Sequence, residues 1–403
     1  MTTKQLHLQP NQLNLRIKLP ASKSISNRAL ILNALSYSVY DIQNLSDCDD
    51  TRVTVKALDS NDTTFDIGAA GTAMRFLTAF LAKTCGEWII TGSERMRNRP
   101  IKLLVDALNT LGAKIEYLEK EGFPPLKIYG SALMGGEISL NGGVSSQYIS
   151  ALMMIAPMMV NGLKIKLEGD VISVPYILMT KKMMKEYGVD ATFEYNEIDI
   201  RPQSYTPIQY RVESDWSAAS YWYEVLSIAG DGEIFLEGLG ENSSQGDSKV
   251  AELFEQLGVH TQYQKDGVLL TTKKGVVSRF EYDFVNQPDL AQTFAVCCCA
   301  KGIPFVFSGV QSLKIKETDR VAALIAELAK FGYHLYEPQH GQLAWDGTHL
   351  PVSSEVPSVK TYEDHRMAMA FAPLALIQPI IIEEPNVVSK SYPRFWEDLE
   401  LIG

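Results

Sequence analysis

The sequence predicts an α/β protein made of six copies of one supersecondary repeat, and three observations lead to that class. Amphipathic helical patterns that end in glycine recur about every 70 residues, at Gly112, Gly188, Gly258, Gly332 and Gly403. More apolar helical patterns recur with a similar period, beginning at Ser22, Gly71, Ser145, Ser217, Pro288 and Asp364. Strand-like runs such as EWIITG and PFVFSG follow the apolar helices.

A glycine after a helix is also an ordinary C-cap, so either series alone would fit many α/β proteins. Two interleaved series with the same period favour six copies of one repeat, and the even number suggests two groups of three. The interval from Ser22 to Gly71 is about 24 residues shorter than the others. We therefore expect a shortened first repeat.

Composition bounds the class of protein. The chain has 403 residues and is 46% hydrophobic and 21% charged, which excludes intrinsic disorder and predicts two or three domains. Its net charge of -11 argues against a general nucleic-acid binder. Anionic ligands must then be held by local clusters of cations.

The cysteine pattern and the lack of a recognisable targeting signal both favour the cytoplasm. The five cysteines are an odd number, three of them are adjacent, and none lies in a CxxC pair, so neither disulfides nor a metal site are expected. No stretch reaches the ~20 apolar residues of a membrane span, and the N-terminus lacks a secretory signal. We expect a cytoplasmic protein without a membrane partner.

The beginnings of the apolar helices carry residues suited to anions. The first turns contain serine, glycine or aspartate together with Lys23, Arg28, Arg75 and Arg366. A helix N-terminus offers unpaired N–H groups and a partial positive charge. Serine and aspartate there are also ordinary N-caps, but cations in a first turn oppose the helix dipole and capping does not explain them. Several such helix ends together predict a polyanion site.

Three other charged motifs precede helices. Arg95, Arg97 and Arg99 fall within five residues and form either an anion clamp or a solvated basic loop. In KIKETDR, Lys316, Glu317 and Arg320 combine an acid with cations, although Glu317 and Arg320 also suit a plain i, i+3 ion pair.

In EDHRMAM, Asp364, His365 and Arg366 stand before a helix too apolar for the surface. They suggest either the floor of a site or a buried ion pair beside a satisfied histidine. Asp215 and Asp289 occupy equivalent places in their repeats. Each could serve as a catalytic base or only as a helix N-cap. The chain has no GxxxxGK[ST], strand-following GxGxxG, HExxH or GxSxG motif, which argues against ATP, nicotinamide, zinc-hydrolase and serine-hydrolase chemistry.

In this order the motifs resemble those of the 5-enolpyruvylshikimate-3-phosphate synthase family, also called 3-phosphoshikimate 1-carboxyvinyltransferases. The resemblance covers nearly the whole chain and rests on LPASKSISNRAL, AAGTAMR, RMRNRPI, SSQY, KETDR, DHRMAM and SKSYPRF. It implies the enolpyruvyl transferase fold, an inside-out α/β barrel of two similar domains with three βαβαββ units each. We place one domain at 19–213 and the other at 1–18 with 214–403, with the active site in the cleft between them and domain closure excluding water.

The resemblance implies transfer of the enolpyruvyl group of phosphoenolpyruvate to the 5-hydroxyl of shikimate 3-phosphate, with release of phosphate, in the route to aromatic amino acids. The shikimate 3-phosphate ligands by motif are Lys23, Ser24, Arg28, Ser145, Ser146, Ser173, Asp289, Ser312 and Lys316. The phosphoenolpyruvate ligands are Lys23, Gly71, Arg99, Gln147, Arg320, Arg366 and Lys390.

By the same resemblance, Asp289, Glu317 and Lys23 are catalytic, with Asp215 and His365 in support. Asp289 takes the hydroxyl proton and Glu317 sits by the methylene carbon, while the group that protonates this carbon stays open. No cofactor or metal is implied, and we expect a monomer. The herbicide glyphosate occupies the phosphoenolpyruvate site in this family, and the presence of Gly71 favours sensitivity.

The chain departs from the family pattern at Ala69, Phe76 and Ser312, which replace the usual Asn, Pro and Asn. The stretch between Arg28 and Gly71 is short, so a strand or a helix is missing there. Two alternatives stay open: a non-catalytic scaffold that binds the same anions, and UDP-N-acetylglucosamine enolpyruvyl transferase. The second expects an Asn after the first Lys and a Cys in the arginine-rich loop, whereas Ser24 follows Lys23 and the loop has no Cys.

Overall fold

The apolar helical patterns form helices that are buried on nearly every side, as expected for helices without a polar face. In a computed structural model that describes residues 2–10 and 12–403, all ten residues from Ser146 to Ile155 are helical, and eight of them are buried. The helix from Gly71 to Lys83 buries eleven residues. These helices form the interior, and short strands lie outside them.

By contacts the chain divides into two compact units. Unit 1 contains residues 1–20 and 214–403, and unit 2 contains residues 21–213. Leu19 and Pro20, which the sequence-based division gave to the other domain, fall in unit 1. That each unit is an independent domain stays a prediction.

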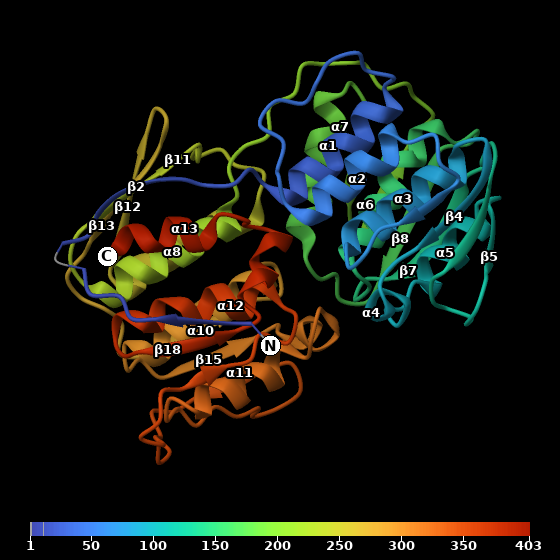
Figure 1. Ribbon diagram of the computed structural model, residues 1–403. Helices are drawn as coiled ribbons and strands as arrows, with labels where there is room; N and C mark the ends of the chain where they lie inside the picture. Colours follow the sequence, from blue (N-terminus) through green and yellow to red (C-terminus); the bar gives the residue numbers. More distant parts are fainter. Residues whose placement is uncertain (1, 11) are drawn as a thin grey trace. The chain divides into compact units, whose positions relative to one another are not determined.

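Unit 2 contains seven α-helices and eight strands in its described residues. These are α1 (Lys23–Leu35), α2 (Asp49–Asp59), β3 (Thr64–Asp66), α3 (Gly71–Lys83), β4 (Gly86–Thr91), α4 (Glu94–Arg97), α5 (Lys102–Thr110), β5 (Lys114–Tyr117), β6 (Leu126–Gly130), β7 (Gly136–Asn141), α6 (Ser146–Ile155), β8 (Leu163–Glu168), α7 (Val174–Glu186), β9 (Thr192–Glu194) and β10 (Glu197–Ile200). The strands make two four-stranded sheets, β3-β4-β6-β5 and β7-β8-β10-β9. Within this unit, α1, α2, α3, α6 and α7 pack on one another, and β4 and β5 lie along the outside (Figure 1).

Unit 1 has the two N-terminal strands and everything after residue 213. Its α-helices and strands are β1 (Thr3–Leu6), β2 (Asn14–Lys18), α8 (Trp216–Ala229), β11 (Glu233–Glu237), α9 (Val250–Phe254), β12 (Val259–Gln264), β13 (Gly267–Thr272), β14 (Phe280–Asp283), α10 (Ala291–Ala300), β15 (Phe305–Ser308), α11 (Arg320–Ala329), β16 (Leu343–Trp345), β17 (Ser358–Val359), α12 (His365–Phe371), β18 (Ile380–Glu383) and α13 (Phe395–Leu399). Short 3-10 helices that matter below are η2 (Gly246–Lys249), η4 (Pro288–Leu290), η5 (Gln311–Ile315) and η7 (Pro385–Lys390).

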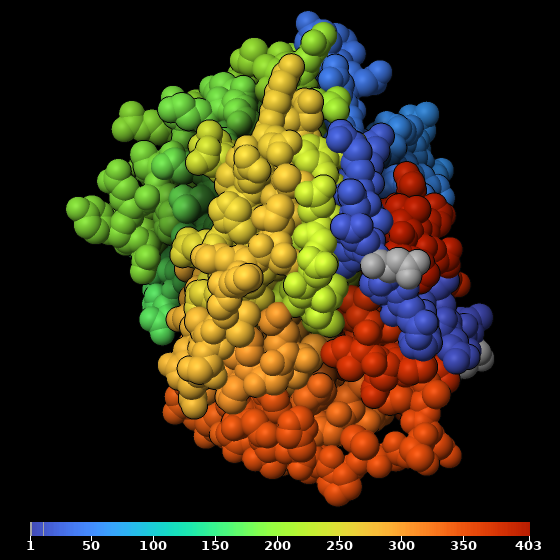
Figure 2. Space-filling model, turned by 90° about the vertical axis from the view of Figure 1, so that its left-hand side faces the viewer, coloured from blue at the N-terminus to red at the C-terminus, as the bar shows by residue number. Residues whose placement is uncertain are grey.

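Three sheets surround the helices of unit 1: β12-β13-β11-β2, β1-β18-β17 and β14-β15-β16. The N-terminal strands close two of them, since β2 pairs in parallel with β11 and β1 pairs antiparallel with β18. On the face drawn in Figure 2, the blue β2 lies beside the lime β11, and the yellow-orange β13 and β12 follow. The first residues of the chain are thus built into the part of the fold that contains the last ones.

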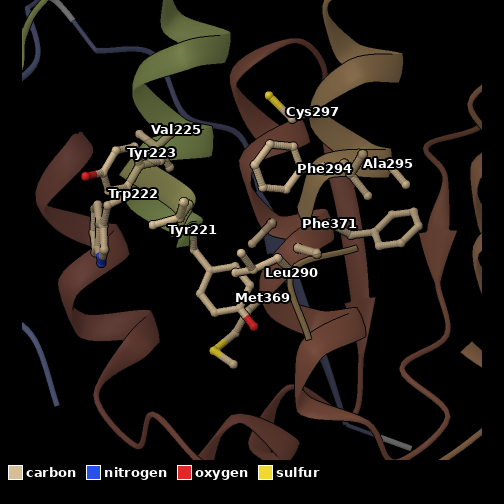
Figure 3. Close-up of a cluster of buried hydrophobic side chains, with 14 of the residues drawn as sticks. Tyr221, Trp222, Tyr223, Val225, Leu290, Phe294, Ala295, Cys297, Met369 and Phe371 are labelled. Atoms are coloured by element: carbon tan, nitrogen blue, oxygen red, sulfur yellow. The ribbon is translucent and has the colours of Figure 1, made fainter. Parts of the chain in front are cut away.

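The core of unit 1 is rich in aromatic rings contributed by its central helices. Tyr221 and Trp222 from α8 are almost fully buried, and so are Phe294 from α10 and Met369 from α12 (Figure 3). The Phe294 ring lies 4.6 Å from that of Phe254, measured between centroids, which is a packed aromatic distance. This core fixes the beginnings of α8, α10 and α12, where the charged motifs lie.

The shortened first repeat has lost its strands and kept its helix. Between Ser36 and Thr63 the described residues contain α2 and one isolated β-bridge, between Gln43 and Arg211, and the first strand that joins a sheet is β3, which begins at Thr64. The described residues thus form five sheets. None of the described helices is long and apolar enough to cross a membrane.

Candidate functional site

Lys23 is the first residue of α1, as the sequence predicted for a cation at a helix N-terminus. Its ammonium nitrogen lies 3.8 Å from the carboxylate of Asp50 on α2, and its side chain is 16% exposed. The preceding Ser22 is buried, and its hydroxyl makes no cap hydrogen bond. Capping therefore does not account for Ser22, and Lys23 keeps a solvent-accessible surface.

Arg28, one turn further along α1, is only 2% exposed. Its guanidinium donates to the Thr180 hydroxyl at 2.7 Å, the Ser150 hydroxyl at 2.9 Å and the Ser24 carbonyl at 2.9 Å. Burial lowers the pKa of Arg28 to about 10, and Tyr176 opposes this shift. Arg28 thus links α1 to α6 and α7.

The departure at Phe76 has a structural counterpart. Its ring is buried on α3 and lies 5.2 Å from the central carbon of the Arg28 guanidinium, within cation–π range. Ala69, by contrast, is exposed in the loop before α3. The Phe76 substitution therefore packs against a predicted substrate ligand, whereas the Ala69 substitution does not alter the core.

The beginnings of α3 and α6 lie together. Gln147 donates to the Thr72 hydroxyl at 3.2 Å, and Ser145 caps α6 by accepting from the Gln147 backbone N–H at 3.4 Å. Ser146 is the first residue of α6. Ser173 precedes α7 in a left-handed conformation, with φ of 55°.

Arg99 and Gly71 meet in the same unit. A Cβ atom added at Gly71 would lie 2.7 Å from Nη1 of Arg99, so glycine is what allows the guanidinium to approach the start of α3. The Pro100 carbonyl accepts hydrogen bonds from Tyr148 at 2.6 Å and from Arg75 at 3.3 Å. Sequence reasoning did not find that Arg75 and Tyr148 hold the segment that bears Arg99.

The three arginines before α5 separate in the structure. Residues Glu94–Arg97 form the short helix α4, capped by the Ser93 hydroxyl, rather than an irregular loop. Arg97 pairs with Glu119 at 3.1 Å on the surface, so the plain solvated interpretation holds for that residue. Arg99 lies beside Gly71, next to the Pro100 carbonyl that Tyr148 and Arg75 bind.

In unit 1 the carboxylate of Asp289 lies among three cations. Arg320 reaches it at 2.9 Å, Arg366 at 3.1 Å and Lys316 at 3.9 Å, and its side chain is 14% exposed. Burial pushes the pKa of Asp289 up, but Arg366, Lys316 and Arg320 outweigh it and hold the pKa well below its usual value. Asp289 is on η4 rather than the start of an α-helix, and its carbonyl accepts from Arg366 at 3.2 Å.

Glu317 is the second carboxylate of this cluster. It accepts from Arg320 at 2.9 Å and from Lys390 on η7 at 2.9 Å, so the predicted i, i+3 pair is present but is part of a larger network. Arg320 also binds Asp364 at 2.7 Å. Burial lowers the pKa of Arg320, yet Asp364, Glu317 and Asp289 together raise it above its usual value.

The remaining predicted residues have other surroundings. Asp215 caps α8 by accepting from the Ala218 backbone N–H at 2.9 Å, so the cap interpretation holds for Asp215, whereas the Asp289 carboxylate pairs with cations. His365 is buried on α12, with a ring nitrogen 3.6 Å from Asp364. Ser312 lies on η5, just before Lys316. Within the described residues, no group of three His, Cys, Asp or Glu side chains is placed to hold a metal ion.

The comparisons with known proteins agree with this geometry. The sequence matches the family described as EPSP synthase (3-phosphoshikimate 1-carboxyvinyltransferase) over residues 8–61 and 58–399. The chain belongs to that family. It is 54% identical to the 3-phosphoshikimate 1-carboxyvinyltransferase of Bacteroides fragilis, covering 98% of this chain and 96% of that protein. It is 38% identical to that of Vibrio atlanticus, covering 99% of both.

A solved structure, the EPSP synthase of Acinetobacter baumannii, has the same fold as this EPSP synthase family member. The TM-score is 0.80 with 19% identity, covering 100% of this chain and 98% of that one. The predicted family, enzyme class and enolpyruvyl transferase fold are therefore confirmed. The roles of individual residues stay predictions.

Proposed function

We propose that this chain transfers the enolpyruvyl group of phosphoenolpyruvate to the 5-hydroxyl of shikimate 3-phosphate and releases phosphate. One observation carries the proposal: Asp289 and Glu317 are buried together among Lys316, Arg320, Arg366 and Lys390. Two carboxylates suit the two proton transfers of an addition followed by an elimination. The surrounding cations suit the anionic substrates.

Unit 2 supplies the cations and hydroxyls that we assign to the substrate phosphates. Lys23, Arg28 and Arg99 contribute positive charge, and Ser24, Ser145, Ser146 and Ser173 contribute hydroxyls. The neutral partners of Arg28 support this assignment, since they leave its charge available to a phosphate. Gln147 and Gly71 shape the place where Arg99 holds the donor.

The reaction has two stages. In the addition, the 5-hydroxyl oxygen forms a bond to C2 of phosphoenolpyruvate, its proton passes to Asp289, and the methylene carbon C3 gains a proton to become a methyl group. In the elimination, the methyl group loses a proton, the double bond returns, and the bond from C2 to the phosphate oxygen breaks. We assign the proton at C3 to Glu317, with Lys23 as the other candidate donor.

The cations around Asp289 give substrate binding a direct effect on the base. In the absence of substrate, Arg320, Arg366 and Lys316 hold the pKa of Asp289 low, which makes it a weak base. An incoming carboxylate or phosphate competes for the same cations and so weakens their effect on Asp289. The pKa of Asp289 then rises, and the carboxylate becomes a stronger base when the hydroxyl is present.

The test is phosphate release by the purified protein given phosphoenolpyruvate with shikimate 3-phosphate. We expect release that depends on shikimate 3-phosphate and is lost in Asp289→Ala and Lys23→Met. UDP-N-acetylglucosamine serves as the competing acceptor, and release that depends on it would favour the sister enzyme. A folded protein that binds both substrates and releases no phosphate with either acceptor would be a scaffold, which contradicts the proposal.

Three further expectations belong to the same proposal. The enzyme works without a cofactor or metal, it is cytoplasmic, and it is a monomer. Sedimentation equilibrium of the purified chain tests the last of these. Inhibition by glyphosate that competes with phosphoenolpyruvate tests the assignment of Gly71 and Arg99 to the donor, and an inhibition constant far above the KM for phosphoenolpyruvate would contradict sensitivity.

A further inference from the structure

The segment Asn242–Asp247 has no role in the proposed reaction, yet it is bound to the elements that carry it. The Gln245 side chain is buried; it accepts from the Trp216 backbone N–H at 3.0 Å and donates to the Ser214 carbonyl at 2.8 Å. The next carbonyl, of Gly246, accepts from Gln287 at 3.4 Å, two residues before Asp289. The segment therefore joins the start of α8 to the loop that precedes the proposed base.

Asp247 ends this segment with a buried carboxyl, and the residue is only 5% exposed. It accepts a short hydrogen bond from the Ser217 hydroxyl. The same hydroxyl accepts from Nη2 of Arg366 at 3.5 Å, and this nitrogen is 3.1 Å from the Asp289 carboxylate. Arg366 therefore lies between two carboxyl groups, one in direct contact and one linked through Ser217.

The charged and titratable groups that face Asp247 come from four elements. They are Asp289 on η4, Arg366 on α12, Asp215 at the start of α8 and Tyr282 on β14. Burial raises the pKa of Asp247 to about 7; Asp289 and Asp215 add to the rise, whereas Arg366 and the Ser217 hydrogen bond oppose it. The carboxyl is thus neutral in slightly acidic solution and ionised in alkaline solution, while Asp289 stays ionised throughout.

We propose that Asp247 is a positioning residue that acts through Ser217 on Arg366, and that its charge sets how strongly Arg366 holds an anionic donor. The inference rests on the proposed function, because it assigns Arg366 to phosphoenolpyruvate. With Asp247 neutral, Arg366 is in contact with the carboxylate of Asp289 and retains attraction for a further anion. With Asp247 ionised, a second negative charge lies near Arg366 in a buried place, where screening is weak, and it opposes the incoming anion.

The first consequence concerns the KM for phosphoenolpyruvate. In the parent enzyme we expect this KM to rise several-fold between pH 6 and pH 9, as Asp247 loses its proton. Asp247→Asn keeps the shape and an acceptor for Ser217 but stays neutral, so its KM is expected to change less over the same range. Asp247→Ala removes the acceptor of Ser217 and is expected to raise the KM at every pH, with a smaller effect on kcat.

A second consequence is independent of turnover. An anion bound at Arg366 favours the protonated form of Asp247, so binding near neutral pH takes up a proton. Titration calorimetry of phosphoenolpyruvate, in buffers of different ionisation enthalpy and without shikimate 3-phosphate so that no turnover occurs, measures that uptake. The phosphate of the ligand also titrates, with a second pKa of about 6, but its contribution to the proton uptake is the same in all variants. In Asp247→Asn, the part of the proton uptake that comes from Asp247 is expected to disappear.

Glu224→Gln is the matched control. Glu224 is a carboxyl in the same unit, fully buried on α8, and burial raises its pKa well above the usual value. Its variant is expected to follow the parent in both measurements. Both variants must show a cooperative thermal transition, which indicates that they are folded. If the KM for phosphoenolpyruvate then depends on pH in the same way in the parent and in Asp247→Asn, the inference is overturned.

The two proposals fail in different ways. Absence of phosphate release from the parent contradicts the proposed function alone, and the calorimetric comparison then still decides the role of Asp247. Phosphate release with equal proton uptake in parent and Asp247→Asn leaves the proposed function intact and rejects the role of Asp247.

Discussion

Arg28 in unit 2 and Arg320 in unit 1 are both almost fully buried, at 2% and 1% exposure, but their partners differ. The described partners of Arg28 are two hydroxyls and a carbonyl, supported by the rings of Phe76 and Tyr176. Arg320 binds three carboxylates, from Asp289, Glu317 and Asp364. Both guanidiniums are positively charged, but only the charge of Arg320 is balanced by neighbouring carboxylates among the described contacts.

The difference separates two tasks. A buried cation with neutral partners has lost its hydration without gaining a counterion, so it is poised to bind an anion from outside. A cation among carboxylates holds them ionised and in place, as proton transfer requires. We therefore assign phosphate binding to Arg28 in unit 2 and the proton transfers to the cluster around Arg320 in unit 1.

The largest expected effect is on Arg320, the arginine whose charge is balanced by carboxylates. Arg320→Met removes an ion-pair partner from two buried carboxylates, those of Asp364 and Asp289. Breaking a buried ion pair in this way costs about 3–5 kcal/mol of unfolding free energy. Urea denaturation measures the loss, and phosphate release is expected to disappear. Arg279→Met, which breaks a surface pair with Glu281, is the control and is expected to stay within about 1 kcal/mol of the parent.

The next largest effect is on Arg28, the arginine whose described hydrogen-bond partners are neutral. In Arg28→Met, the hydroxyls of Thr180 and Ser150 still bond to each other, so the unfolding free energy is expected to fall by only about 1–2 kcal/mol. The KM for shikimate 3-phosphate is expected to rise at least ten-fold, because the charge for its phosphate is gone. A stability loss as large as that of Arg320→Met, with an unchanged KM, would break the distinction between the two arginines.

A smaller effect is expected at Gly71. An added Cβ would lie 2.7 Å from the end of the Arg99 side chain, which can move aside, so Gly71→Ala displaces the guanidinium without unfolding the helix. The KM for phosphoenolpyruvate is expected to rise several-fold in steady-state kinetics. Gly240→Ala, where an added Cβ meets nothing within 4 Å, is the matched control. Unchanged donor kinetics in Gly71→Ala would remove Arg99 from the donor site.

The smallest effect is a difference in acid sensitivity. The pKa of Asp289 is lowered in the folded state, so its stabilisation is present above the unfolded pKa of about 4 and is lost as the pH falls below that value. Lys316→Met removes one cation that lowers this pKa and is expected to make the acid loss of stability shallower. Arg28→Met is expected to keep the parent slope, and a change of slope there would show that Asp289 does not dominate the acid region.

The sequence predicted the repeats, the helices with cations in their first turn, and the residues of the acid–base cluster. These features are local, because apolar periodicity and motif spacing lie within one segment. The partners of Arg320 are less accessible to such reasoning: Asp364 lies forty-four residues further along the chain and meets Arg320 only through the packing of α10, α11 and α12.

The features that the sequence did not predict also depend on contacts between distant segments or on very short elements. The Asn242–Asp247 segment shows no periodicity and no recognised motif, so the role inferred for Asp247 depends on its approach to Ser217 and Arg366 in the fold. The contact of Phe76 with Arg28 joins α3 to α1, which the sequence could not pair. A one-turn helix such as α4 is too short for a periodic pattern.

The single bridge between Gln43 and Arg211 indicates where this architecture tolerates changes in length. The repeat around it keeps α1 and α2, including Lys23, Arg28 and Asp50, although it contributes no strand of its own before β3. The hydrogen-bonded exterior can thus be reduced without altering the ends of the interior helices. For protein engineering, the exposed turn at Tyr37 and Val39 is accordingly a natural place to insert a reporter peptide into a working enzyme.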